Sequence, residues 1–130
     1  MTPANISTLT LGSETIEDCL LVTVAGRIDH TNSDTFLADL NAYVVKVPEG
    51  GGMVIDLGNL EYITSAGLRA LLLAQRTLTA AGARLVVTRI SGVVKEVFRI
   101  SQFDSLLGVA ETTKAAIGQI SPSAAEAFTG

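Results

Sequence analysis

The segment EYITSAGLRALLLAQ, residues 61–75, places two hydroxyl side chains directly before a strongly apolar helical run. Thr64 and Ser65 follow an apolar strand and a short loop, at the position where ligand sites of open α/β sheets tend to lie. A serine at a helix start commonly caps it, since its oxygen accepts a hydrogen bond from a backbone N–H two or three residues on. The same position suits a phosphate, because a helix N-terminus offers unpaired N–H donors and a favourable dipole. Ser65 is therefore a candidate helix cap and a candidate phosphorylation site.

The other residue types that carry chemistry give weaker signals. His30 is the only histidine, so a paired-histidine metal site is excluded, and we interpret it as a surface residue beside Asp29. Cys19 is the only cysteine and lies within a predicted strand, which excludes an internal disulfide and disfavours a cysteine nucleophile. The triple glycine at 50–52 precedes a strand, whereas a phosphate loop follows one, so we interpret it as a linker. No cofactor and no metal are predicted.

Four carboxylates lie around the same region of the sequence: Asp29, Asp34, Asp56 and Glu61. Pairs of acids perform acid–base chemistry or bind Mg²⁺, but sequence spacing alone does not bring these four together. Asp56 is most simply a residue at the end of a strand, and Asp34 a first-turn residue favoured by the helix dipole. An enzyme is therefore the least favoured class, because it needs more convergent polar groups than this chain offers.

Short apolar strands alternate with amphipathic helices, and these elements must position Ser65. Because parallel strands need a crossover connection, usually a helix, the alternation predicts an α/β fold. We expect a mixed, mainly parallel sheet of about five strands with about four helices, in which the first two strands form a hairpin. Asn32 or Ser33 is expected to cap the first helix, and Ser91 the third. The predicted strands span 6–12, 19–26, 53–57, 83–90 and part of 103–111, and the predicted helices span 33–47, 65–81, 92–101 and 112–120.

Composition and charge exclude several classes of protein. We expect one domain, residues 1–118, followed by a flexible tail of small and polar residues at 119–130. The net charge is −4 and the nine Lys and Arg residues are scattered, which disfavours nucleic acid as a partner. No apolar stretch reaches the ~18 residues of a membrane-spanning helix, and no secretory signal pattern begins the sequence. We therefore expect a cytoplasmic protein without membrane insertion.

Three segments together resemble the STAS domain family, especially its bacterial anti-sigma factor antagonists. The run VIDLGNLEYITSAGLRALLLAQRTLTAAGARLVV resembles the family's signature region, in which an apolar strand and a short loop lead to a D-S-S/T-G-L motif and a helix. VTVAGRIDHTNSDTF is similar to the family's first turn and helix, and ISGVVKEVFRISQFDSLLGV to a later conserved segment. The likeness covers residues 8–118 with the matches in the right order, so it predicts a single STAS-like domain.

The resemblance implies a partner switch. In the family, an anti-sigma factor that is itself a kinase phosphorylates the first serine of the motif. Only the unmodified antagonist binds the anti-sigma factor and so frees the sigma factor, and a phosphatase restores it. Aligned on Gly67 and Leu68, that serine falls on Ser65, and the resemblance carries over Asp29 as an acid close to it.

Two positions depart from the family motif. Thr64 stands where the family usually has Asp, and Ala66 where it has Ser or Thr, so one competing phosphoacceptor is absent.

The expected exposed side of the helix carries three residues at four- and three-residue steps, Arg69, Leu73 and Arg76. They are predicted to contact the partner; a solvated helix face is the alternative interpretation.

The sequence thus predicts a non-enzymatic anti-sigma factor antagonist controlled by phosphorylation of Ser65. Its expected partners are an anti-sigma factor of the ATP-dependent serine kinase type and a serine phosphatase. The alternative is a soluble STAS subunit of a transporter or signalling complex, in which Ser65 only caps the helix.

Overall fold

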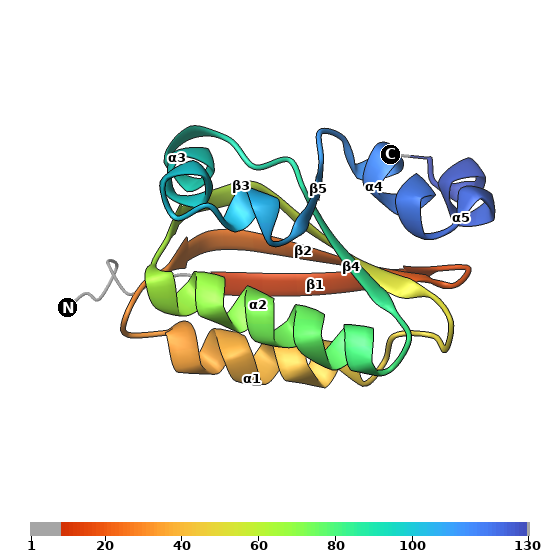
Figure 1. Cartoon of the computed structure of the whole chain (residues 1–130), viewed down its shortest axis with the longest axis horizontal. Coiled ribbons are helices and arrows are strands. Elements are labelled where there is room, and N and C mark those ends of the chain that lie inside the picture. Colours follow the sequence, from red (N-terminus) through yellow and green to blue (C-terminus); the bar gives the residue numbers. More distant parts are fainter. Residues whose placement is uncertain (1–8, 130) are drawn as a thin grey trace.

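The chain forms a five-stranded sheet in the order β1-β2-β3-β4-β5, with helices on both faces (Figure 1). The computed structural model describes residues 9–129. β1 and β2 pair antiparallel as a hairpin, and all other neighbouring strands are parallel. The strands are β1 Leu9–Ile16, β2 Cys19–Ile28, β3 Gly52–Ile63, β4 Arg84–Thr88 and β5 Gly108–Ala110. The helices are α1 Ser33–Val44, α2 Ser65–Ala80, α3 Gly92–Ile100, α4 Thr113–Ile120 and α5 Pro122–Ala127, with a 3₁₀ turn η1 at Phe103–Ser105.

The predicted α/β class, the hairpin and the mainly parallel sheet are confirmed. β3 is longer than the predicted 53–57, because it continues to pair with β2 through two irregularities as far as Ile28 and Ile63. Residues 6–8 of the first predicted strand lie outside the described residues. Within residues 9–129, no helix is long and apolar enough to cross a membrane.

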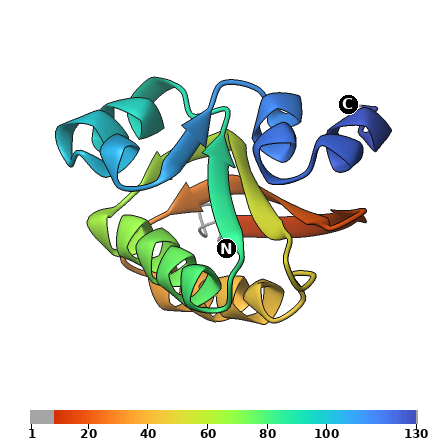
Figure 2. The same ribbon diagram turned by 45° about the vertical axis from the view of Figure 1, so that its right-hand side comes forward.

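Both faces of the sheet are buried, which explains why its central strands read as near-continuous apolar runs. Alternate residues of β3 point to opposite faces: Met53 and Ile55 belong to the core beneath α1 and α2, and Val54 to a smaller cluster with α4 and α5. In Figure 2, α1 and α2 lie on one side of the sheet and α4 and α5 on the other. Phe98 of α3 is fully buried in the larger core.

The C-terminal segment differs from the predicted flexible tail. Residues 122–127 form α5, a fifth helix where about four are predicted. The Ser121 hydroxyl accepts a hydrogen bond from the Ala124 N–H at 3.2 Å, and Pro122 occupies the first turn, where its missing N–H costs nothing. Ala124 is fully buried in the cluster under α4. The small residues of this segment show no apolar periodicity. Ser121 followed by Pro122, a typical helix start, is the only sign of this helix in the sequence.

Asp56 lies in the middle of β3 rather than at a strand end, contrary to the prediction. Its side chain is almost buried and accepts hydrogen bonds from the Gly58 N–H at 2.8 Å and the Thr113 hydroxyl at 3.1 Å. Arg89 forms an ion pair with the same carboxylate at 3.2 Å. Asp56 therefore ties the loop after β4 and the start of α4 to the central strand.

Removal of residues 121–130 tests the packing of α5. The truncation should lower the free energy of unfolding by about 1–3 kcal/mol, because it uncovers the apolar cluster that Ala124 and Phe128 help to bury. Chemical denaturation followed by circular dichroism measures this change. Glu126→Ala, an exposed position on the same helix, is the control and should stay within about 0.5 kcal/mol of wild type. A truncated chain as stable as the full chain would show that α5 does not dock.

Candidate functional site

The carboxyl ends of β2 and β3 bring the predicted site residues to one edge of the sheet. Ile28 pairs with Ile63 in register, and the N–H of Thr64 donates to the carbonyl of Ile28 at 3.1 Å. The loop that begins at Asp29 therefore starts beside the strand end from which α2 begins. Figure 1 shows α1 and α2 both starting at this end of the sheet. Ser65 is the first residue of α2 and is exposed.

Thr64, and not Ser65, caps α2. Thr64 has extended backbone angles (φ −94°, ψ 171°), and its hydroxyl accepts a hydrogen bond from the Gly67 N–H at 3.3 Å. Ser65 lies one residue further on, and its hydroxyl makes no hydrogen bond with any residue of the described range 9–129. Thr and Asp are both capping residue types, so Thr64 is competent to cap α2 at the position where the expected motif has Asp. The hydroxyl of Ser65 is consequently free for chemistry.

Gly67 allows α2 to approach the strand ends closely. A Cβ atom at this position would lie 2.7 Å from Cγ1 of Ile63 and 2.8 Å from Cγ2 of Ile28. Both isoleucines are fully packed, with at most 1% of their surface exposed, so neither can move aside easily. The glycine of the predicted motif is therefore a packing requirement that places the first turn of α2.

Asp29 contributes a fixed negative charge to this edge. Its carboxylate accepts hydrogen bonds from the hydroxyl of Thr31 and from the Thr31 N–H, the latter at 2.9 Å. The bond from the Thr31 hydroxyl has the larger effect and the bond from the N–H the smaller. Both lower the pKa of Asp29 below its ordinary value, so this carboxyl is ionised at neutral pH. Both hydrogen bonds to this carboxylate thus come from its own loop. His30 is exposed, as predicted.

A groove between α1 and α2 includes Ala66, the residue that follows Ser65 in the sequence. It has a volume of about 180 Å³ and is lined by Ser33, Asp34, Leu37, Ala66, Arg69, Ala70 and Leu73. Of the predicted contact residues, Arg69 and Leu73 line this groove, whereas Arg76 is exposed further along the helix. Two of the three predicted partner contacts therefore line a groove that also includes Ala66, next to Ser65 in the sequence.

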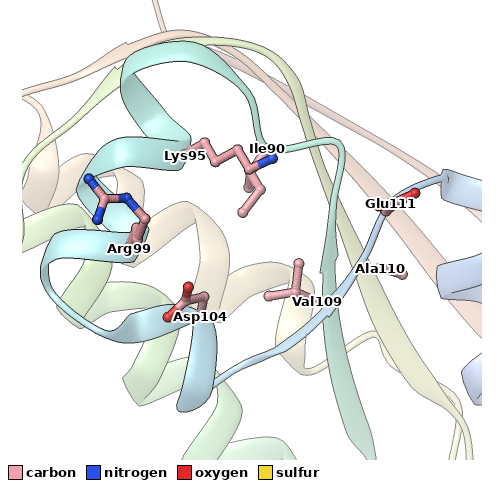
Figure 3. Close-up of a pocket in the computed structure, with 7 residues that line it drawn as sticks. All are labelled: Ile90, Lys95, Arg99, Asp104, Val109, Ala110 and Glu111. Carbon is pink, nitrogen blue, oxygen red and sulfur yellow. The ribbon is translucent and has the colours of Figure 1, made fainter.

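A larger pocket of about 360 Å³ lies elsewhere, between α3 and the end of β5 (Figure 3). Ile90, Val109 and Ala110 supply its apolar walls, and Lys95, Arg99, Asp104 and Glu111 the charged ones. The Arg99 guanidinium points away from Val109 in Figure 3 and pairs with Glu96 at 2.6 Å. The pocket holds no pair of groups arranged as nucleophile and base.

Two further kinds of chemistry lack a site in the described part of the chain. Cys19 is fully buried, and burial, together with the nearby charge of Asp18, raises its pKa to about 11, so the thiol stays protonated. Residues 9–129 contain no group of three or more His, Cys, Asp or Glu side chains placed to hold a metal ion.

Comparisons with known proteins establish the family. The STAS domain model matches residues 11–116, so the chain belongs to the STAS domain family, as the sequence motifs indicate. BtrV of Bordetella bronchiseptica, named as an anti-sigma factor antagonist, is 37% identical over 106 residues, which cover 82% of this chain and 90% of BtrV.

Solved structures share the fold. An anti-sigma factor antagonist from Mycobacterium paratuberculosis has a TM-score of 0.74 at 22% identity, over 87% of this chain and 94% of the other. Unphosphorylated SpoIIAA has a TM-score of 0.68 at 18% identity, over 95% of this chain and 100% of the other. SpoIIAA of Bacillus in its phosphorylated form has a TM-score of 0.60 at 19% identity, over 86% of this chain and 98% of the other.

Gly67→Ala tests the close approach of α2. The added methyl should cost about 1–3 kcal/mol of unfolding free energy, because it overlaps two packed isoleucines. Thermal and urea denaturation provide the measurement. Arg69→Ala removes an exposed side chain two residues later and should change stability by no more than about 0.5 kcal/mol. Equal stabilities of the two variants would mean that the helix can shift away from the sheet without cost.

Proposed function

We propose that the protein is an anti-sigma factor antagonist whose binding to an anti-sigma factor is switched off by phosphorylation of Ser65. The observation that carries the proposal is the free, exposed hydroxyl of Ser65 in the first turn of α2. Because Thr64 makes the cap, a phosphate on Ser65 does not remove the capping bond. The likeness to BtrV, named as an anti-sigma factor antagonist, supports the function, and SpoIIAA, which shares the fold, is one protein with a phosphorylated form.

Ser65 acts as the acceptor in the phosphoryl transfer. Its Oγ forms a bond to the γ-phosphorus of ATP held by the partner kinase, the bond to the β,γ-bridging oxygen breaks, and ADP leaves. The hydroxyl proton passes to a base of the kinase. This chain supplies the nucleophile and the rigid helix that presents it, and a serine phosphatase later hydrolyses the ester.

The added charge explains why modification blocks binding. A phosphoserine carries about −1.5 to −2 charges at pH 7. Asp29 and Glu61 already make this edge acidic, and the whole chain has a net charge of −4. A partner packed over Ser65 would have to bury the uncompensated phosphate, which costs several kcal/mol.

The groove between α1 and α2 is the proposed partner-binding surface. Leu73 is half-buried in it and offers apolar contact, while Arg69 and Arg76 provide cations on a helix that has no acidic residue. In an acidic protein these arginines favour a partner surface with carboxylates.

The second candidate is a STAS subunit of a transporter or signalling complex without serine modification. The observation that favours it is the departure at Ala66 and Thr64 from the family's phosphorylated motif. Under this alternative the exposed hydroxyl of Ser65 would have no role.

Phosphate mapping distinguishes the two candidates. The protein is incubated with ATP and the anti-sigma factor kinases of its organism, and the modified residue is located by mass spectrometry. We expect phosphate on Ser65, its loss in Ser65→Ala, and its retention in Thr64→Asp, which keeps a capping side chain. Phosphate confined to other residues, or none with any of these kinases, would contradict the switch.

A further inference from the structure

We propose that Arg69 binds the phosphate of phosphorylated Ser65, so that modification closes a bridge along α2 and withdraws this guanidinium from the partner-binding groove. The inference rests on the proposed phosphorylation and assigns its regulation to a residue of this chain. It makes the switch depend on the capture of a cation as well as on the repulsion of the partner.

The helix geometry brings the two side chains together. Ser65 and Arg69 are four residues apart on α2, and both are exposed. Side chains at this spacing lie on the same helix face, with their Cβ atoms about 5–6 Å apart. Because Cα–Cβ bonds tilt toward the helix N-terminus, the long stem of Arg69 runs back toward Ser65. A phosphate on Ser65 thus lies within reach of the guanidinium without any movement of the backbone.

Arg69 is available for this contact. Within the described residues 9–129, ion pairs are formed by Arg89 and Arg99 but not by Arg69. Asp34 of α1 also lines the groove, yet no ion pair within 4.0 Å joins it to Arg69. A phosphate offers more charge than this carboxylate and three acceptor oxygens, and it matches the planar fork of arginine.

The charges around Ser65 define what Arg69 must offset. Asp29 and His30 lie in the loop from β2, Glu61 lies near the end of β3, and Asp34 lies in the first turn of α1. The cation Arg27 lies near the end of β2, with its guanidinium over the ring of Tyr62. The three carboxylates raise the second pKa of a phosphate at this edge. A nearby guanidinium and the helix dipole lower it.

Arg76 provides a matched control on the same helix. Arg69 and Arg76 are the only charged residues of α2, and both are exposed. Arg76 is eleven residues beyond Ser65, about 16 Å along the helix axis, so its guanidinium cannot reach the phosphate. Loss of either arginine changes the net charge by the same amount, and only one of them should affect the phosphate directly.

The test is a phosphorus-31 NMR titration of the full chain with phosphoserine inserted at position 65 during synthesis. We expect Arg69→Ala to raise the second pKa of the phosphate by about 0.5 unit or more, and Arg76→Ala to leave it nearly unchanged. Arg69→Lys should give a smaller rise, because lysine keeps the charge but loses the bidentate fork. Circular dichroism verifies that each variant is folded.

A rise in Arg69→Ala no larger than that in Arg76→Ala would overturn the bridge. Because the phosphate is installed without a kinase, this result is independent of whether a kinase recognises Ser65. If the kinase experiment finds no phosphate on Ser65, the proposed function is contradicted, but the result of the titration still stands. Failure of the titration would leave a switch that works by repulsion alone.

Discussion

The close contact between the first turn of α2 and the ends of β2 and β3 is the constraint on which the site depends. The N–H of Thr64 is bonded to Ile28, and Gly67 fits between Ile28 and Ile63 with no room for a Cβ atom. These contacts fix the helix start relative to the sheet. The direction in which Ser65 projects is therefore set by the core, and not by a mobile loop.

A rigid helix start separates the surface chemistry from the fold. Thr64 satisfies the N–H of Gly67, and the buried face of α2 packs on the sheet through residues such as Leu68 and Leu71. Ser65 takes part in neither task, so the proposed phosphate on Ser65 would leave these contacts in place. Charges of both signs lie at this end of the sheet: Asp29, Glu61 and Arg27 on the strand and loop side, and only arginines along α2. Under the proposed function, one modified side chain would then be sufficient to change what the surface can bind.

The sequence predicts those parts of the fold that local patterns specify. The near-continuous apolar runs at 19–26 and 83–90 predicted buried strands, which the structure has as β2 and β4, and the helical spacing after Ser65 predicted α2, because periodicity reflects burial directly. The location of Ser65 at a strand-to-helix junction followed from the same patterns.

Other features depend on contacts that sequence spacing does not reveal. Asp56 contacts Arg89 and Thr113, which are 33 and 57 residues away in the sequence. Only the folded sheet could therefore show that Asp56 connects three elements and does not end a strand. The choice of Thr64 over Ser65 as the cap is decided by backbone angles, since both side chains are competent acceptors. α5 forms because Ala124 fits against the second face of the sheet, and the small residues of this segment carry no apolar pattern of their own.

The central claim is that charge on Ser65 controls binding of the anti-sigma factor. Its most direct test is titration calorimetry of that partner against the full-length protein with Ser65 either unmodified or phosphorylated. The account predicts a Kd weaker by about 100-fold or more in the phosphorylated form, equivalent to about 2.8 kcal/mol. Equal affinity of the two forms would contradict it.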